Sequence, residues 1–217
     1  EAYSSYVDPV GYAAMSEDDD GNVTYAGLRA AINNAGKGDT VTIVNPDTPT
    51  VSESLTIPSG VTVIVDGVTL NFSKDLTIQE GAKLVNKGTI SMSATSKLTV
   101  YGELDSTEGT VAGDEATEPA SKTSVYSTGT ITLGGLTDPT IANAISDAVV
   151  NAAYYIDDDG NMVITSAAKA AAAVAQKDVN KDMNLSGVFS ESGEIVADGI
   201  TITVDDAAKV SLGTVVL

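Results

Sequence analysis

The sequence predicts a mainly β fold, a single-stranded parallel β-helix (solenoid) in which short strands wind into stacked coils. Triplets of the form Leu-Thr-Ile or Leu-Thr-Val begin at Leu55, Leu76 and Leu98, so the pattern recurs after roughly 20 residues. Within each repeat, apolar and polar residues alternate in short runs that Gly, Asn or Asp separates. A meander of hairpins is the alternative, since Asp66-Gly67 suits a tight turn, but a meander does not require this fixed spacing.

The composition suits narrow coils. Of the 217 residues, 42% are hydrophobic, which favours a folded core over a disordered chain. The chain has no Trp and two Phe, so Val, Ile, Leu and Ala supply most of the apolar volume. These side chains favour thin, β-branched packing over a broad aromatic core.

Residues 1–38 form an N-terminal segment that ends in a predicted capping helix. Apolar residues fall at helical spacing at Tyr25, Leu28, Ala31, Ile32 and Ala35. Gly36 and Gly38 end this helix just before the first predicted strand. We expect the helix to close one end of the coil.

Residues 39–136 form the predicted β-helix coils. The first and last residues of each triplet share one side of a strand, so they should face inward while the central Thr faces outward. The inward residues are Leu55, Ile57, Leu76, Ile78, Leu98 and Val100. Corners, often with positive φ, are expected at Gly60, Gly67, Gly81, Gly88 and Gly102. Residues 105–122 are polar and acidic and predict an exposed loop.

Two quoted segments carry a family resemblance. "YAGLRAAINNAGKGDTVTIV" followed by "SLTIPSGVTVIVDG" resembles the opening of pectin-lyase-like right-handed β-helix proteins of cell surfaces. In that group a capping helix also precedes Gly-Asp-Thr and coils with an Ile-Pro-Ser-Gly-Val-Thr motif. The resemblance covers residues 23–104 and the last coil. It implies a β-helix fold and a structural subunit of the archaeal sheath or S-layer type, and it says little about activity.

Residues 137–194 are predicted to form a helix-rich insertion. "DPTIANAISDAVVNAAYY" places Pro139 near a first turn, with apolar residues at Ile141, Ile145, Val149 and Ala153. "TSAAKAAAAVAQKD" is rich in Ala, the strongest helix former, and Thr165 or Ser166 is placed to cap it.

The coil is predicted to resume in residues 195–217, where "ITVDDAAKVSLGTV" repeats the pattern of "LTIQEGAKLVNKGTI". Because no capping segment follows, we expect the last coil to offer an open β-edge to another copy of the chain. The expected edge residues are Val210, Leu212, Val215, Val216 and Leu217. The alternative is that the inserted helices fold back and cover this edge within one molecule.

The strongly negative net charge disfavours some classes of binding partner. A net charge of -19, from 30 acidic and 11 basic residues, disfavours nucleic acid and anionic lipid. No apolar run approaches the roughly 20 residues that span a bilayer, so no membrane insertion is expected. The chain opens at Glu1 without Met, as an exported protein does after signal-peptide removal. A trimmed chain would begin in the same way.

The catalytic repertoire is small, and we expect no enzyme. There is no His and no Cys, and Arg29 is the only Arg. The polysaccharide lyases that the resemblance brings into question use basic residues around an acid-bound calcium ion. We therefore expect no lyase or hydrolase activity on acidic polysaccharides, with or without calcium.

Two further kinds of site are candidates. Calcium, the one cofactor considered, could bind Asp157, Asp159 and Asn161 of "DDDGN", although a solvated acidic turn is the favoured interpretation of the motif. "DVNKDMN" offers Asp178, Asn180 and Asp182 in a similar order, but Met183 replaces the turn Gly of calcium loops. Glycosylation sequons begin at Asn22, Asn71 and Asn184, a number that chance also produces in a chain rich in Ser and Thr.

These observations predict an extracellular structural protein of the cell envelope that assembles with copies of itself into a layer, sheath or filament. An adhesin or carbohydrate-binding module on the same fold is the alternative, and a polysaccharide lyase is a third hypothesis.

Overall fold

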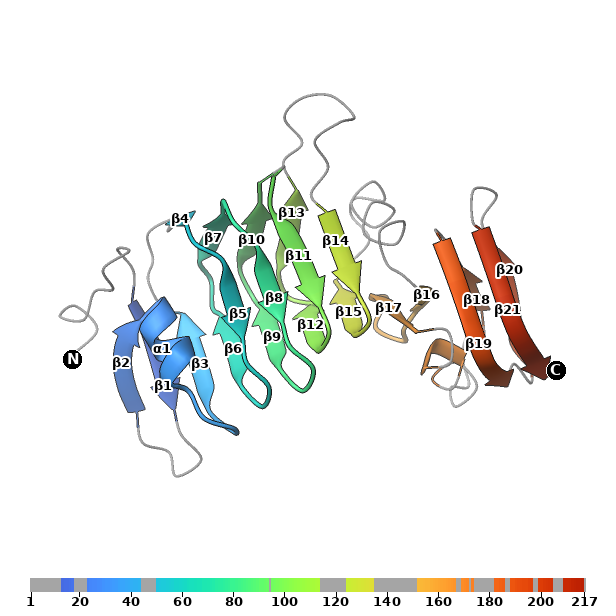
Figure 1. Cartoon of the computed structure of the whole chain (residues 1–217), viewed down its shortest axis with the longest axis horizontal. Coiled ribbons are helices and arrows are strands. Elements are labelled where there is room, and N and C mark those ends of the chain that lie inside the picture. Colours follow the sequence, from blue (N-terminus) through green and yellow to red (C-terminus); the bar gives the residue numbers. More distant parts are fainter. Residues whose placement is uncertain are drawn as a thin grey trace. The chain divides into compact units, whose positions relative to one another are not determined.

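The computed structural model describes residues 13–17, 23–43, 50–93, 95–113, 124–134, 152–166, 169–171, 173, 182–185, 188–196, 199–204 and 209–216. The chain divides into two compact units, residues 1–124 and residues 125–217. Each unit has its own set of strands, drawn along the chain from blue to red (Figure 1).

The first unit is a single-stranded parallel β-helix behind a short N-terminal hairpin. The hairpin and cap consist of β1 (Ala13–Glu17), β2 (Val23–Gly27) and α1 (Leu28–Asn34). The coils consist of β3 (Thr40–Ile43), β4 (Thr50–Val51), β5 (Leu55–Ile57), β6 (Thr62–Val65), β7 (Thr69–Phe72), β8 (Leu76–Ile78), β9 (Lys83–Asn86), β10 (Thr89–Met92), β11 (Lys97–Val100), β12 (Glu103–Ser106) and β13 (Thr110–Gly113).

Every third strand of this unit lies in the same sheet, so the coil has three sides. One side has the order β3-β6-β9-β12, the second β4-β7-β10-β13 and the third β5-β8-β11. The pairs are parallel: Leu76 of β8 lies opposite Leu55 on one side and Leu98 on the other. The three Leu-Thr-Ile/Val triplets therefore stack in register, which confirms the predicted β-solenoid.

Burial follows the alternation expected from the sequence. Ile57, Ile78 and Val100 form one ladder inside the coil, and each is at most 1% exposed. Thr56 is exposed and Thr77 half-buried on the other face of the same strands. Thr99, the next residue in that outer ladder, departs from the expectation, because it is only 7% exposed.

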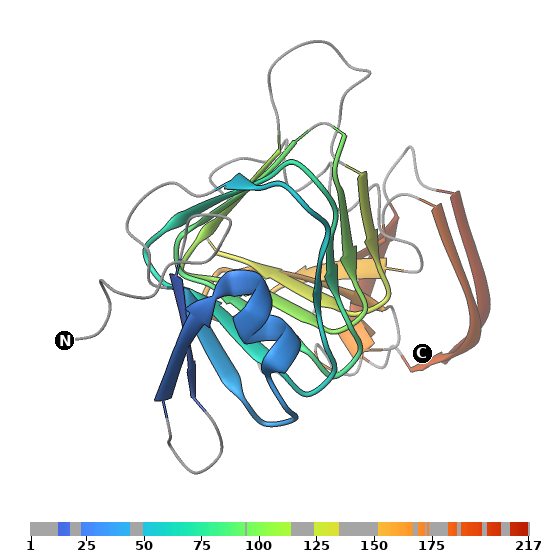
Figure 2. The ribbon, with the colours of Figure 1, turned by 60° about the vertical axis from the view of Figure 1, so that its left-hand side comes forward.

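The N-terminal cap is shorter than predicted. Residues 23–27, including Tyr25, form β2 rather than the start of the helix, and α1 begins at Leu28. Leu28, Ala31 and Ile32 are buried as expected, and Figure 2 shows α1 lying across the end of the coil. The chain enters the helix from a strand because β1 pairs antiparallel with both β2 and β3, which extends one sheet beyond the first coil.

Glycine is required at the corners for two different reasons. Gly60, Gly67 and Gly81 have positive φ, as predicted. At Gly88 a positive φ is not the cause. An added Cβ there would lie 2.1 Å from the carbonyl oxygen of Val68 in the preceding coil, so close stacking of the backbones excludes a side chain.

One corner of the coil interior is polar. Asn86 follows Ile43 and Val65 in the ladder of inward residues, yet it is fully buried. Its Nδ2 donates to Ser106 Oγ and to the Thr110 carbonyl, each at 2.9 Å, and its Oδ1 accepts from the Gly88 N–H at 3.1 Å. The buried amide is thus satisfied by the coil that follows it and by its own corner.

The second unit contains strands where helices were predicted. Its strands are β14 (Ser124–Ser127), β15 (Thr130–Leu133), β16 (Ala152–Ile156), β17 (Met162–Ser166), β18 (Asp182–Leu185), β19 (Val188–Val196), β20 (Thr201–Val204) and β21 (Lys209–Val216). One sheet has the order β15-β17-β16-β18-β20, and β19 pairs with β21. The prediction of a helix-rich insertion over 137–194 is therefore wrong in its described parts.

The predicted helices are replaced by strands mainly in residues 152–166. Ala153, which was expected at the end of a helix, lies in β16, and Thr165 and Ser166, which were expected as caps, lie in β17. β16 and β17 form an antiparallel hairpin in which Ala153 pairs with Thr165 and Tyr155 with Val163. Aromatic and β-branched residues on both sides of the turn outweigh the helical propensity of the alanines. Residues 169–171 are helical, whereas Ile141, Ile145 and Val149 lie outside the described residues.

Candidate assembly edge

The last two strands form a coil of their own that stacks on the coil before it. β20 pairs parallel with β18, and β21 pairs parallel with β19. Parallel strand pairs do occur near the C-terminus, but they begin at residue 182 rather than at residue 195. Within the described residues, β20 and β21 each have one strand neighbour, so the other edge of each strand is unpaired there.

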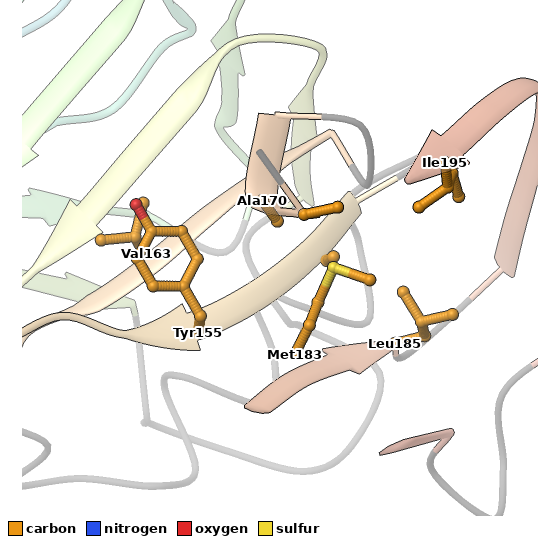
Figure 3. Packing of buried hydrophobic residues seen from close by; sticks show 8 residues of the cluster. Tyr155, Val163, Ala170, Met183, Leu185 and Ile195 are labelled. Carbon is orange, nitrogen blue, oxygen red and sulfur yellow. The ribbon is translucent and has the colours of Figure 1, made fainter. Parts of the chain in front are cut away.

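The preceding coil is well packed. A cluster of buried side chains joins β16, β17, β18, β19 and the helical residues 169–171; its members are Ala153, Tyr155, Val163, Ala170, Ala171, Met183, Leu185 and Ile195. In Figure 3, Met183 points toward Ala170, and Leu185 lies across from Ile195. Ile200 and Ile202 of the last coil pack against this cluster but are only partly buried.

Burial falls off abruptly from this coil to the last one. Met183 is fully buried, whereas its partner Ile202 is half-buried. Leu185 is 0% exposed, whereas its partner Val204 is 48% exposed. On the other pair of strands, Ile195 is buried and its partner Val215 is half-buried. The apolar ladder thus continues into the last coil but is not covered there by any described residue.

The predicted edge residues lie partly in this coil. Val210, Leu212, Val215 and Val216 are all in β21, opposite Phe189, Glu191, Ile195 and Val196 of β19. Val216 is 42% exposed. Leu217 lies outside the described residues.

Two residues of this edge were missed from the sequence. Ile202 and Val204 of β20 belong to the same open coil as the predicted residues. The sequence does contain a signal for them, since apolar and polar residues alternate in "ITITV" as they do in the strands of the first unit.

The calcium candidates form a hairpin turn between β16 and β17. Asp157 Oδ1 accepts from the N–H groups of Asp159 at 3.0 Å and Asn161 at 2.8 Å, and its Oδ2 accepts from Asn161 Nδ2 at 3.2 Å. The carboxylate thereby closes the turn, a structural role common for Asp. Among the described residues, no group of three or more acidic side chains is placed to hold a metal ion. Asp178 and Asn180 lie outside those residues, and Asp182 is in β18.

The sequons are placed differently from one another. Asn71 lies in β7 on the outer face of the coil and is half-buried. Asn184 lies in β18, and Asn22 is outside the described residues. Whether any of them carries a glycan stays a prediction.

Tyr155 makes the second unit sensitive to alkaline pH. Burial raises the pKa of its phenol, and the nearby charge of Asp157 adds to the effect. The folded state therefore retains the proton above the pH, about 10, at which the unfolded chain loses it. Its contribution to stability is complete below pH 10 and is lost as the pH rises through the folded pKa.

We expect Tyr155→Phe to reduce this alkaline loss of stability. Urea unfolding of the parent chain and of the variant at pH 8 and pH 11 measures it. The midpoint of the parent should fall more between the two pH values than that of the variant. Equal falls would show that Tyr155 does not couple folding to pH.

Comparison of the chain with protein-family models, curated proteins and solved structures gave no match. The resemblance to pectin-lyase-like cell-surface proteins accordingly stays a prediction. None of the helices described by the structure has the length and hydrophobicity needed to span a membrane.

Proposed function

We propose that this protein is an extracellular structural subunit that assembles with copies of itself, through β-edge contacts, into a surface layer, sheath or filament of the cell envelope. The observation that carries the proposal is the uncovered apolar ladder of the last coil, from Leu185 at 0% exposed to Val204 at 48%. The predicted resemblance of residues 23–104 and the last coil to pectin-lyase-like β-helix proteins of cell surfaces is in line with this proposal.

The strands of the last coil that the structure describes, β20 and β21, carry little of the usual protection of an edge. Soluble β-proteins blunt exposed edges with charge, Pro or a covering element. β20 has the sequence Thr-Ile-Thr-Val, without charge or Pro, and Lys209 is the only charged residue of β21. Unpaired backbone groups beside exposed Val204 and Val216 favour pairing with another strand.

The placement of the only Arg supports a structural role over catalysis. Arg29 forms an ion pair of 2.6 Å with Glu53 and donates to the Ser54 carbonyl at 3.3 Å. It thereby ties the capping helix to the first coil. We propose that the chain has no lyase activity, for which a free basic group beside the substrate would be needed.

The proposal predicts that charge in the last coil prevents assembly. We expect Val204→Lys and Val216→Lys to leave the fold intact by circular dichroism but to abolish polymers in electron micrographs, because each places an ammonium group at the contact. Ile156→Lys is the matched control, since Ile156 is also exposed, at 37%, but lies outside the last coil. Normal polymers from the two valine variants would rule out this edge as the contact.

A carbohydrate-binding module is the second candidate, favoured by one face of the first unit. The outward positions of β4, β7, β10 and β13 that the structure describes carry hydroxyl and amide groups and no charge; they are Thr50, Thr69, Asn71, Thr89, Ser91 and Thr110. By contrast, the neighbouring sheet carries Lys83, which pairs with Glu103 at 2.8 Å. Co-sedimentation with insoluble polysaccharides tests this function, and Thr89→Lys should abolish it without affecting assembly.

A further inference from the structure

A second open edge lies at the start of the chain. β2 is bonded to β1 through the pairs from Ala13–Gly27 to Glu17–Val23, and it is the last strand of its sheet. Among the described residues, no strand lies on its other side. In the described part of the first unit, β2 is therefore an edge strand.

The capping helix packs on this sheet but is not one of its strands. α1 packs against β1, β2, β3 and β5, so it covers the end of the coil. A helix does not extend the strand ladder, and the order of this sheet ends at β2 in the described residues. The hairpin of β1 and β2 carries the sheet past the first coil, and β2 forms its margin.

Charge indicates what can meet these edges. Two copies that each carry a net charge of -19 repel one another, so charge opposes their contact least at strands without acidic residues. β2 has the sequence Val-Thr-Tyr-Ala-Gly, and β20 has Thr-Ile-Thr-Val. Neither strand contains a charged residue or Pro. Each edge thus suits a second copy of this chain better than either suits a charged partner.

We propose that β20 of one copy pairs with β2 of the next. The inference rests on the proposed self-assembly and names the two surfaces that meet. Because the donor and acceptor edges differ, each subunit keeps one edge free after binding, and the contact can repeat without limit. Pairing of β20 with β20 would use the same edge of both copies, and that contact by itself would give only a dimer.

Disulfide trapping tests this contact in the 217-residue chain, which contains no Cys of its own. Residues opposite one another on paired strands have Cα atoms about 4.5–5.5 Å apart, within the range that a disulfide bridges. Thr24→Cys and Tyr25→Cys sample the two sides of β2, and Thr203→Cys and Val204→Cys sample the two sides of β20. Each β2 variant is mixed with each β20 variant and oxidised under conditions in which the unmodified chain polymerises.

We expect at least one of the four mixtures to give a disulfide between β2 and β20 peptides by mass spectrometry. The control is Thr62→Cys in β6, which is bonded on both sides by β3 and β9 and should give no such product. If the unmodified chain polymerises but only β20–β20 disulfides form, or none involves β2, the inference is wrong and self-assembly stands. If the unmodified chain does not polymerise, the proposed function itself fails.

Discussion

Replacing Ile78 with Asp is expected to unfold the first unit under conditions in which the parent chain is stable. Ile78 is 0% exposed and lies between Ile57 and Val100 in the inner ladder. A carboxylate there would have no partner among these aliphatic neighbours. An unpaired buried charge costs on the order of 5 kcal/mol, which is comparable with the whole stability of many domains.

The neighbouring residue supplies the control for this variant. Thr77 is half-buried on the outer face of the same strand, so Thr77→Asp should lower the melting temperature only slightly. Thermal unfolding followed by circular dichroism compares the two variants. Equal losses would mean that the inner and outer faces of β8 have been assigned wrongly.

Gly88→Ala is expected to have the second-largest effect. Its Cβ would lie 2.1 Å from the Val68 carbonyl oxygen and 2.9 Å from the Val68 nitrogen. Both are backbone atoms of a stacked coil, so relief requires the two coils to separate. That separation would also strain the bond of 2.9 Å from the Thr89 N–H to the Val68 carbonyl. Overpacking of this kind costs roughly 3 kcal/mol.

Gly36→Ala provides the comparison for Gly88→Ala. At Gly36 an added Cβ would meet only Asp39 Oδ2, at 3.6 Å, which is an ordinary contact. Urea unfolding should show a clearly lower midpoint for Gly88→Ala and a small change for Gly36→Ala. Similar midpoints for both variants would contradict the inference that coil spacing is what excludes a side chain at residue 88.

The sequence predicts the coils well because one physical pattern governs them. Leu55, Leu76 and Leu98 are predicted as equivalent and lie in one ladder. Alternation decides the face of each residue, and spacing decides which residues stack. The cap was predicted too long, because helical periodicity alone does not show that residues 23–27 are needed as a strand beside β1.

The second unit was predicted less well because two local signals compete there. "AAYYIDDDGNMVITS" contains a hairpin signal, with Asp-Gly between β-branched and aromatic residues. The many alanines around it favour a helix, and propensity alone cannot show which tertiary contacts decide the outcome. Packing of Tyr155 and Val163 in the buried cluster stabilises the strands.

The candidate assembly edge could be predicted only in part, because long-range contacts also decide which residues form it. The alternation in β21 indicated an apolar edge, but the exposure of Val204 depends on which coil is last. Strand order is a property of long-range pairing, and the start of the stacked strands at Asp182 lies in a segment without clear periodicity. The role of Asp157 in closing its turn likewise depends on backbone N–H positions rather than on residue spacing.

The buried amide of Asn86 has a consequence for how the chain finds its fold. In a solenoid of similar coils, correctly and incorrectly stacked arrangements differ little in stability. A strand that pairs one coil too early or too late still buries Leu, Ile or Val. Asn86 increases this difference, because its Nδ2 finds both acceptors, Ser106 Oγ and the Thr110 carbonyl, in the coil that correctly follows. A coil stacked in the wrong register would leave the amide buried without these acceptors, which would cost about 1–3 kcal/mol of stability. A single buried polar side chain thereby favours the correct stacking register over the shifted ones.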